Sequence, residues 1–270
     1  MKKILFLISA VLFGVCANAQ SISLYQGKTE IQNFAPTDID SIVFKADAPT
    51  GTLSGARKID ATWCSIGTSI TWYNNNVSTG GGRFTRGYQD RVMDKLAFKQ
   101  LINGGDNGGT AERNYSKKST LIKKADYYTI EHGINDWGNS VPVGTLEDYI
   151  NGADNGTFAS AMRKIVNYIF RLNPKAKVVL CTPRKGFGFG GYLPDHWYDA
   201  KNGIYLKEYA DLVRQIASYE SFPVADFFNE CGGQTTLPHL SIDSALHPND
   251  AGYQMMANVL IKAFEKILVN

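Results

Sequence analysis

The sequence is poor in the features that mark several classes of protein. Its formal net charge is only +3, and no five like charges occur in a row, so nucleic-acid binding is not indicated. After residue 15 no apolar run is long enough to span a bilayer, so no transmembrane segment is expected. The chain has no H-E-x-x-H or C-x-x-C motif, and its four histidines share no ligand spacing. We therefore expect neither a metal nor another cofactor.

Cysteine is also scarce. The chain has four cysteines, of which Cys64 and Cys181 lie in apolar runs typical of buried strands. A chain of 270 residues buries enough apolar surface to fold without a covalent staple. We therefore interpret these two cysteines as packing residues and not as parts of a disulfide framework.

The N-terminus has the pattern of an export signal. Lys2 and Lys3 precede an apolar run over residues 4–15, and Ala17 and Ala19 form a small-x-small cleavage site. This pattern predicts a signal peptide over residues 1–19 and a mature protein that is periplasmic or secreted. Lipidation at Cys16 is the minority alternative, because the residue before a lipidated cysteine is normally small and here it is a valine.

Residues 20–57 form a short segment in front of the main domain. Ile22–Tyr25 and Ile39–Phe44 are rich in β-forming residues and predict the two strands of a β-hairpin. Residues 46–56, rich in Ala, Pro, Thr, Gly and Ser, predict a linker. The main domain then covers residues 58–270. A partner-docking role for the N-terminal segment is an alternative.

From Lys58 onward, apolar runs alternate with amphipathic stretches, which is typical of βαβ units and a parallel sheet. Phe158–Leu172 predicts a helix with one apolar face that ends before Pro174. Asn249 or Asp250 is expected to cap a last helix. The five predicted strands are Lys58–Ile66, Ala97–Ile102, Tyr127–His132, Ala176–Thr182 and Phe222–Phe228.

Ligands of such a sheet bind beyond the carboxyl ends of the strands, and the first strand runs into the turn that carries Ser69. Ser69 is therefore a candidate nucleophile, although a serine at such a place is more often a helix N-cap. The elbow of the α/β-hydrolases requires glycine two residues after the serine. Thr71 stands there, which disfavours that fold.

The later strand ends and the last loop carry further polar candidates. Asn103–Thr110 is rich in glycine, which lets backbone N–H groups approach a ligand, unless the segment is simply a flexible turn. The side-chain amide of Asn135, after the third strand, can donate to a developing oxyanion. His247 precedes the last helix, and Asp243 is the nearest acid on its N-terminal side. A carboxylate there would orient the imidazole of His247, whereas the alternative is a surface-loop histidine.

Four segments together resemble the sequence blocks of the SGNH (GDSL-type) hydrolase family. They are Gly67–Ile70, Asn103–Thr110, Gly133–Asp136 and Asp243–His247, in the order of the family and at successive strand ends. The resemblance implies an α/β fold, a three-layer α/β/α sandwich with a five-stranded parallel, flavodoxin-like sheet. It also implies a serine esterase that hydrolyses ester bonds.

The resemblance further implies a role for each matching residue. Ser69 would be the nucleophile, His247 the general base and Asp243 the acid that orients it. The N–H groups of Ser69 and Gly108 and the side chain of Asn135 would form the oxyanion hole.

Two glycines could supply the backbone donor of the oxyanion hole, and two other positions depart from the family pattern. Gly108 is favoured over Gly105, because it is the second glycine when the segment is aligned with N-x-G-x-x-G-x-T. Thr68 replaces the aspartate of the family at a position outside the triad. Asp243 precedes His247 by four residues instead of three. If the loop bulges, the carboxylate reaches the imidazole; if it does not, a backbone carbonyl holds the histidine and the enzyme is a dyad.

The expected substrate follows from aromatic residues near the strand ends. A loop over residues 184–198 combines glycines with flat aromatic rings that suit sugars, and its alternative is a lid packed on the domain's own surface. Together with export, these rings favour removal of O-acetyl groups from carbohydrate, with a small ester as the simpler substrate. The alternatives are a non-catalytic glycan-binding protein on the same fold and a lipase. The residues expected to bind substrate are Trp72, Trp137, Phe187, Phe189 and Trp197.

Overall fold

The structure is a computed structural model that describes residues 22–26, 29–34, 57–75, 86–186, 198–199, 203–233, 235–242 and 246–268. The chain divides into two compact units, Met1–Thr52 and Leu53–Asn270. Within the described residues, none of the helices combines the length and the apolar character that crossing a membrane requires. The predicted signal peptide and Cys16 lie outside the described residues.

The N-terminal unit contains the predicted β-hairpin, but with a different second strand. Strand β1 (Ile22–Gln26) pairs antiparallel with β2 (Thr29–Phe34), with an irregularity between Leu24 and Tyr25. Only two residues separate the strands. The predicted partner strand, Ile39–Phe44, lies outside the described residues.

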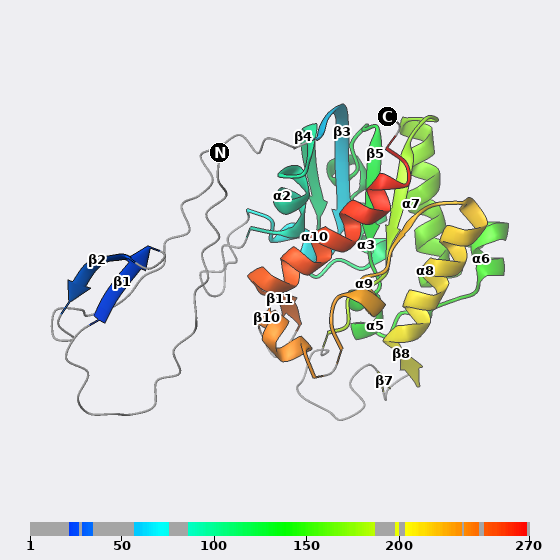
Figure 1. The fold of residues 1–270 in the computed structure, drawn as a ribbon. Coiled ribbons are helices and arrows are strands. Elements are labelled where there is room, and N and C mark those ends of the chain that lie inside the picture. The colour runs from blue at the N-terminus through cyan, green and yellow to red at the C-terminus, as the bar shows by residue number, and fades with distance from the viewer. Residues whose placement is uncertain are drawn as a thin grey trace. The chain divides into compact units, whose positions relative to one another are not determined.

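The second unit is built on a five-stranded sheet in which all neighbouring strands are parallel. The strand order is β4-β3-β5-β6-β9, so the second strand of this unit lies at one edge and the first lies beside it (Figure 1). This order confirms the predicted flavodoxin-like sheet. The strands are β3 (Arg57–Gly67), β4 (Leu96–Gly105), β5 (Tyr127–Glu131), β6 (Lys177–Cys181) and β9 (Val224–Ala225).

Two groups of helices flank the sheet and complete the predicted three layers (Figure 1). The helices of one group contact one another and are α2 (Tyr88–Met93), α9 (Phe227–Glu230) and α10 (Asp250–Glu265). The other group contains α3 (Ala111–Ser116), α6 (Leu146–Asn151), α7 (Phe158–Leu172) and α8 (Leu206–Glu220). Three short helices lie in the connections between strands. Helix α1 (Ser69–Trp72) follows β3, α4 (Lys118–Leu121) precedes β5, and α5 (Ile134–Gly138) follows β5.

Local signals placed the helices α7 and α10 well and the last strand less well. Helix α7 has the predicted bounds, and the Asn249 side chain caps α10 by accepting from Gly252 N–H at 3.0 Å. The predicted strand Phe222–Phe228 is wrong at its C-terminal end. The Asp226 side chain accepts from Asn229 N–H at 3.2 Å and starts α9, so the apolar residues after it are buried by a helical turn.

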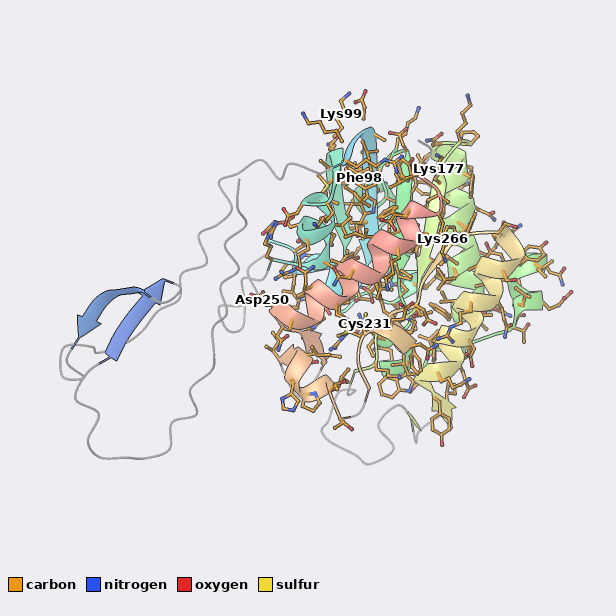
Figure 2. The ribbon with its side chains drawn as sticks, viewed as in Figure 1. Phe98, Lys99, Lys177, Cys231, Asp250 and Lys266 are labelled. Carbon is orange, nitrogen blue, oxygen red and sulfur yellow. The ribbon has the colours of Figure 1, made fainter. Side chains whose placement is uncertain are left out.

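The core lies on both faces of the sheet and holds the three cysteines of this unit as buried thiols. Trp63, near the middle of β3, packs against Phe98 on β4 and Phe264 on α10, with ring centroids 5.6 and 5.2 Å away. Phe98 and the buried Cys231 are labelled in Figure 2. Burial raises the pKa of Cys64 to about 11 and that of Cys231 to about 12. Both therefore remain protonated near neutral pH, as packing residues do.

Candidate active site

The candidate site begins where β3 ends and the first turn of α1 starts. Thr68 is extended and caps α1, its hydroxyl accepting from Ile70 N–H at 3.3 Å, so Ser69 is the first residue of the helix. A side chain at Gly67 would meet Glu131 Oε2 at 2.9 Å and Thr71 Oγ1 closer still. The turn can therefore approach β5 only because residue 67 is glycine.

This close approach predicts that Gly67→Ala is strongly damaging. The added methyl group should cost about 1 to 3 kcal/mol in the free energy of unfolding and should displace Ser69, lowering kcat for ester hydrolysis at least about tenfold. Denaturant titration and steady-state kinetics measure the two effects. Gly233→Ala is the control, since no other described residue has an atom within 4 Å of the added methyl group, apart from the chain neighbours. Wild-type stability and activity in Gly67→Ala would contradict the prediction.

His247 reaches Ser69 from a separate hairpin. Strand β11 (His247–Pro248) pairs antiparallel with β10 (Ser241–Ile242), and His247 is opposite Ile242. His247 Nε2 lies 2.9 Å from Ser69 Oγ, although the two residues are 178 positions apart. The ring of Tyr73 meets the imidazole edge-on, with centroids 4.9 Å apart. Asp243 lies outside the described residues, so its role stays a prediction.

A buried arginine fastens the hairpin that carries His247. Arg184, three residues after the end of β6, is 1% exposed. Its Nη2 donates to Leu240 O at 3.2 Å and to Ser241 Oγ at 2.8 Å. Burial lowers the pKa of Arg184 to about 10, so the group is still a cation near neutral pH. The sequence shows no signal for this contact, because its partners lie more than fifty positions away.

The glycine-rich segment after β4 places backbone donors beside the serine turn. Asp106 N–H donates to Gly67 O at 2.9 Å, and Gly108 has a φ of +73°, which favours glycine. The N–H groups of Ser69 and Gly108 have no acceptor within the described part of the chain. Gly105 N–H already donates to Asn103 Oδ1 at 3.0 Å. This bond occupies the Gly105 N–H, and the choice of Gly108 as the donor stays a prediction.

An ion-pair cluster holds this segment in shape. The Asp106 carboxylate is nearly buried and pairs with Arg113 at 2.9 Å and Lys117 at 3.0 Å. Arg113 also donates to Asn107 O at 3.3 Å and Gly108 O at 3.4 Å. The carbonyl of Gly108 is thereby fixed, which orients the peptide groups on either side of it.

Asn135 supplies a side-chain donor from the next strand end. It lies in α5, is 3% exposed, and its Nδ2 donates to Gly109 O at 3.0 Å. An amide carries two hydrogens, so one remains after this bond. The neighbouring Asp136 accepts from the N–H groups of Ala111 and Gly133, at 3.0 and 3.2 Å, and ties α5 to α3. Burial raises the pKa of Asp136 to about 7.

The predicted substrate-binding residues are placed only in part. Trp72 is half-buried and meets the ring of Tyr73 edge-on, at 5.3 Å between centroids. Trp137 is 5% exposed and belongs to the buried core, and its Nε1 donates to Ile204 O at 3.1 Å. The other three, Phe187, Phe189 and Trp197, lie outside the described residues.

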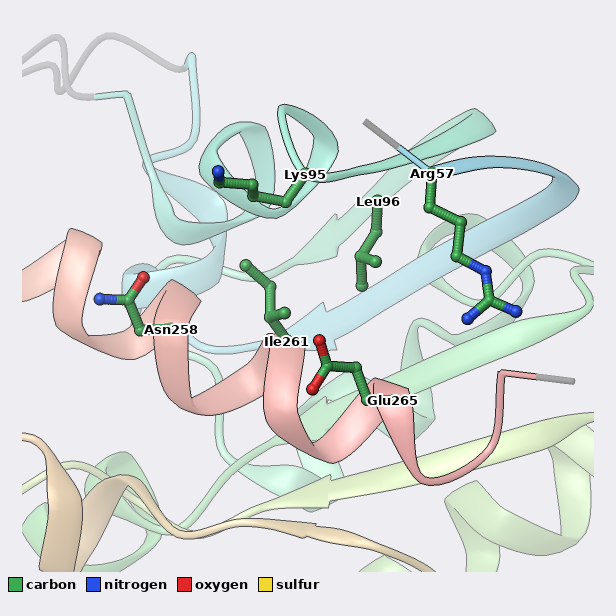
Figure 3. A pocket seen from close by; sticks show the side chains of 6 residues that line it. All are labelled: Arg57, Lys95, Leu96, Asn258, Ile261 and Glu265. Carbon is green, nitrogen blue, oxygen red and sulfur yellow. The ribbon is translucent and has the colours of Figure 1, made fainter. Parts of the chain in front are cut away.

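Two surface hollows lie away from these residues. One lies between the starts of β3 and β4 and the last turns of α10, with Leu96 and Ile261 beside the charged Arg57 and Glu265 (Figure 3). The other lies beside the start of β9 and the end of α8. Neither is lined by a predicted site residue. Among the described residues, no group of three or more His, Cys, Asp or Glu side chains is arranged to hold a metal ion.

The arrangement suits acyl transfer. A hydroxyl in hydrogen-bonding contact with an imidazole is the pattern of an activated serine nucleophile. A tetrahedral oxyanion requires N–H donors that are not already occupied, such as that of Ser69. The serine, the histidine and the donors all lie at the carboxyl ends of the strands, where sheets of this type bind ligands.

Known proteins share both the sequence pattern and the fold. The sequence profile of the GDSL-like lipase/acylhydrolase family matches residues 65–255. A possible lipase from Chitinophaga pinensis is 29% identical, with a TM-score of 0.65 over 77% of this chain and 99% of its own. A lipase/acylhydrolase from Enterococcus faecalis is 18% identical, with a TM-score of 0.54 over 79% and 97% of the two chains.

A catalytic mutant of an acetylxylan esterase from Geobacillus stearothermophilus is also 18% identical and has a TM-score of 0.52, over 76% of this chain and 95% of its own. At this identity, the last two likenesses show the fold alone. No match was found among curated proteins. The family profile spans well over half of the sequence, and the chain therefore belongs to the GDSL-like lipase/acylhydrolase family.

Proposed function

We propose that this hydrolase is a serine esterase in which Ser69 is the nucleophile and His247 the general base. The observation that carries the proposal is the contact of 2.9 Å between Ser69 Oγ and His247 Nε2. A neutral imidazole at that distance accepts the hydroxyl proton as the oxygen attacks a carbonyl carbon. Because the first residue of α1 is also an N–H donor, the nucleophile and part of the oxyanion hole belong to one residue.

The reaction proceeds in two steps. In the first, Ser69 Oγ bonds to the ester carbon, its proton passes to His247, and the N–H groups of Ser69 and Gly108 and the amide of Asn135 stabilise the oxyanion. Collapse expels the alcohol, which takes the proton from His247. In the second step, water attacks the acyl carbon while His247 removes a proton from that water. His247 then gives the proton to Ser69 Oγ as the bond between Oγ and the acyl carbon breaks and the carboxylic acid is released.

Asp243 is proposed to orient His247 and to stabilise the imidazolium that forms during both steps. The sequence spacing leaves a backbone carbonyl as the alternative partner. The two cases differ in the effect of Asp243→Ala. A carboxylate in contact with the imidazole predicts a large loss of kcat, whereas a carbonyl partner predicts a loss of less than about tenfold.

The proposed substrate is an O-acetyl group on carbohydrate. The half-buried Trp72 lies within the same short helix as Ser69, and aromatic faces of this kind suit sugar rings. One protein of the same fold is described as an acetylxylan esterase, which supports this choice of substrate. The predicted signal peptide supports a periplasmic or secreted site of action, where polysaccharide is encountered.

Chain-length dependence of hydrolysis tests this proposal. The protein without residues 1–19 is expected to hydrolyse p-nitrophenyl acetate at least about tenfold faster, in kcat/KM, than the butyrate and octanoate esters. Ser69→Ala supplies the background rate. A preference for octanoate would favour a lipase. Turnover no faster than the Ser69→Ala background would favour the non-catalytic glycan-binding protein, and a glycan array would then identify its ligand.

A further inference from the structure

A fully buried carboxylate lies beneath the turn that carries Ser69. Glu131, the last residue of β5, has no exposed surface. One of its oxygens, Oε2, accepts from Thr68 N–H at 3.2 Å, from Thr68 Oγ1 at 2.8 Å and from Thr71 Oγ1 at 3.1 Å. Thr68 directly precedes Ser69, and Thr71 follows it by two positions. A single oxygen atom therefore holds the turn on both sides of the serine.

The same carboxylate ends a chain of buried hydrogen bonds between the sheet and α2. Successive heavy-atom distances along this chain are 3.0, 3.2, 3.0, 2.8 and 3.1 Å. All of its members are buried. In order, they are Trp63 Nε1, Thr129 Oγ1, Ser65 Oγ, Tyr88 OH, Thr71 Oγ1 and Glu131 Oε2.

Elementary donor counting fixes the direction of this chain. The carboxylate of Glu131 can only accept, so Thr71 donates its one hydroxyl hydrogen to it and must accept from Tyr88 OH. By the same count Tyr88 accepts from Ser65, and Ser65 accepts from Thr129. The indole N–H of Trp63, which can only donate, begins the chain at Thr129. Burial raises the pKa of Tyr88 well above its usual range, so this phenol keeps the hydrogen that it donates.

An ordered chain of donors needs an acceptor at its end. A carboxylate oxygen meets that need, and hydrogen bonds that point the same way strengthen one another in a dry interior. Burial raises the pKa of Glu131 to about 7, while the bonds from Thr68 and Thr71 oppose that rise. The negative form is therefore the one that these donors support.

We infer that Glu131 is a positioning residue for the nucleophile. Its carboxylate fastens Thr68 and Thr71 and thereby holds Ser69 Oγ against His247 and Ser69 N–H toward the oxyanion. The inference rests on the proposed function. It assigns to Glu131 no contact with the substrate, since the residue is wholly buried.

Kinetics of Glu131→Gln and Thr71→Val test the inference. Each variant keeps the shape of the side chain and removes the charge or one donor. We expect kcat for p-nitrophenyl acetate to fall about 10- to 100-fold with KM nearly unchanged, because a small displacement of the nucleophile acts on the chemical step. The rate constant for labelling of Ser69 by a fluorophosphonate should fall by a similar factor. Circular dichroism confirms that the variants tested are folded.

Glu220→Gln is the matched control. Glu220, at the end of α8, likewise accepts hydrogen bonds from more than one side chain, from Tyr149 at 2.8 Å and from Arg163 at 3.1 Å. Its loss should lower the Tm without changing kcat or the labelling rate. If Glu131 were only structural, its variants would behave in the same way.

Each outcome decides the matter. If the wild-type protein is labelled and active, and the folded Glu131→Gln and Thr71→Val variants match it in kcat and labelling rate, the inference is wrong while the proposed function stands. A wild-type protein that is neither active nor labelled overturns the proposed function and the inference with it. Reduced kcat and labelling in both variants, with Glu220→Gln unaffected, support the inference.

Discussion

Ser69→Ala and His247→Ala are each expected to lower kcat for p-nitrophenyl acetate by about 10,000-fold to 1,000,000-fold. The first variant lacks the atom that bonds to the acyl carbon. The second lacks the imidazole that removes the proton of Ser69 Oγ. In the wild-type protein His247 Nε2 lies 2.9 Å from that oxygen. Steady-state kinetics with wild-type protein, each single variant and the double variant measure these losses. Because the two groups act as a unit, the double variant should lose little more than either single variant.

His239→Ala is the matched control for the histidine. His239 is exposed on the 3₁₀ turn Leu237–Leu240, close in sequence to the hairpin of His247. Its imidazole has no proposed role, so kcat and KM should stay at the wild-type values. A His247→Ala variant that retains more than about a tenth of the wild-type kcat would contradict the assignment of the general base.

Asn135→Ala is expected to lower kcat by about 100- to 1,000-fold while KM changes little. The Asn135 amide is one of three proposed donors to the oxyanion, and that charge develops only in the transition state. The remaining donors, from Ser69 and Gly108, account for the residual activity. Steady-state kinetics at several substrate concentrations separate the effect on kcat from any effect on KM.

The loss of Asn135 also removes the bond to Gly109 O, so stability must be measured beside activity. Asn151→Ala on α6 is the control, since Asn151 is exposed and its side chain donates, among the described residues, only to Glu147 on the same helix. It should change neither kcat nor Tm by a measurable amount. An unchanged kcat in folded Asn135→Ala would remove Asn135 from the oxyanion hole.

Local patterns in the sequence predicted much of the fold. Helix α7 has the bounds that its apolar face and Pro174 indicated, because periodicity and the restriction before proline act within a few residues. The order of apolar and amphipathic runs also predicted the parallel sheet. The second hairpin strand and the end of the last strand were predicted less well. Short apolar runs of this kind fit a strand or a helical turn equally, and pairing or a cap decides between them.

Some residues of the candidate site were also predicted from local patterns, and others were not. The motifs at the strand ends predicted Ser69, Asn135 and His247, because each falls at a strand or helix boundary that the sequence marks. Glu131 and Arg184 were not predicted as supports of the site. An acid or a base at the end of an apolar strand has no distinctive pattern, and the partners of both residues lie more than fifty positions away.

The sequence by itself therefore determined the α/β class and the helices α7 and α10, and it predicted which residues react, since local patterns depend on interactions between near neighbours. Only the tertiary structure decided that His247 meets Ser69 at 2.9 Å and that Glu131 lies beneath the serine turn. These contacts depend on strand order and on packing across the whole domain. The physical reason is that side chains far apart in the sequence are brought together by the burial of a shared core, which no local pattern records.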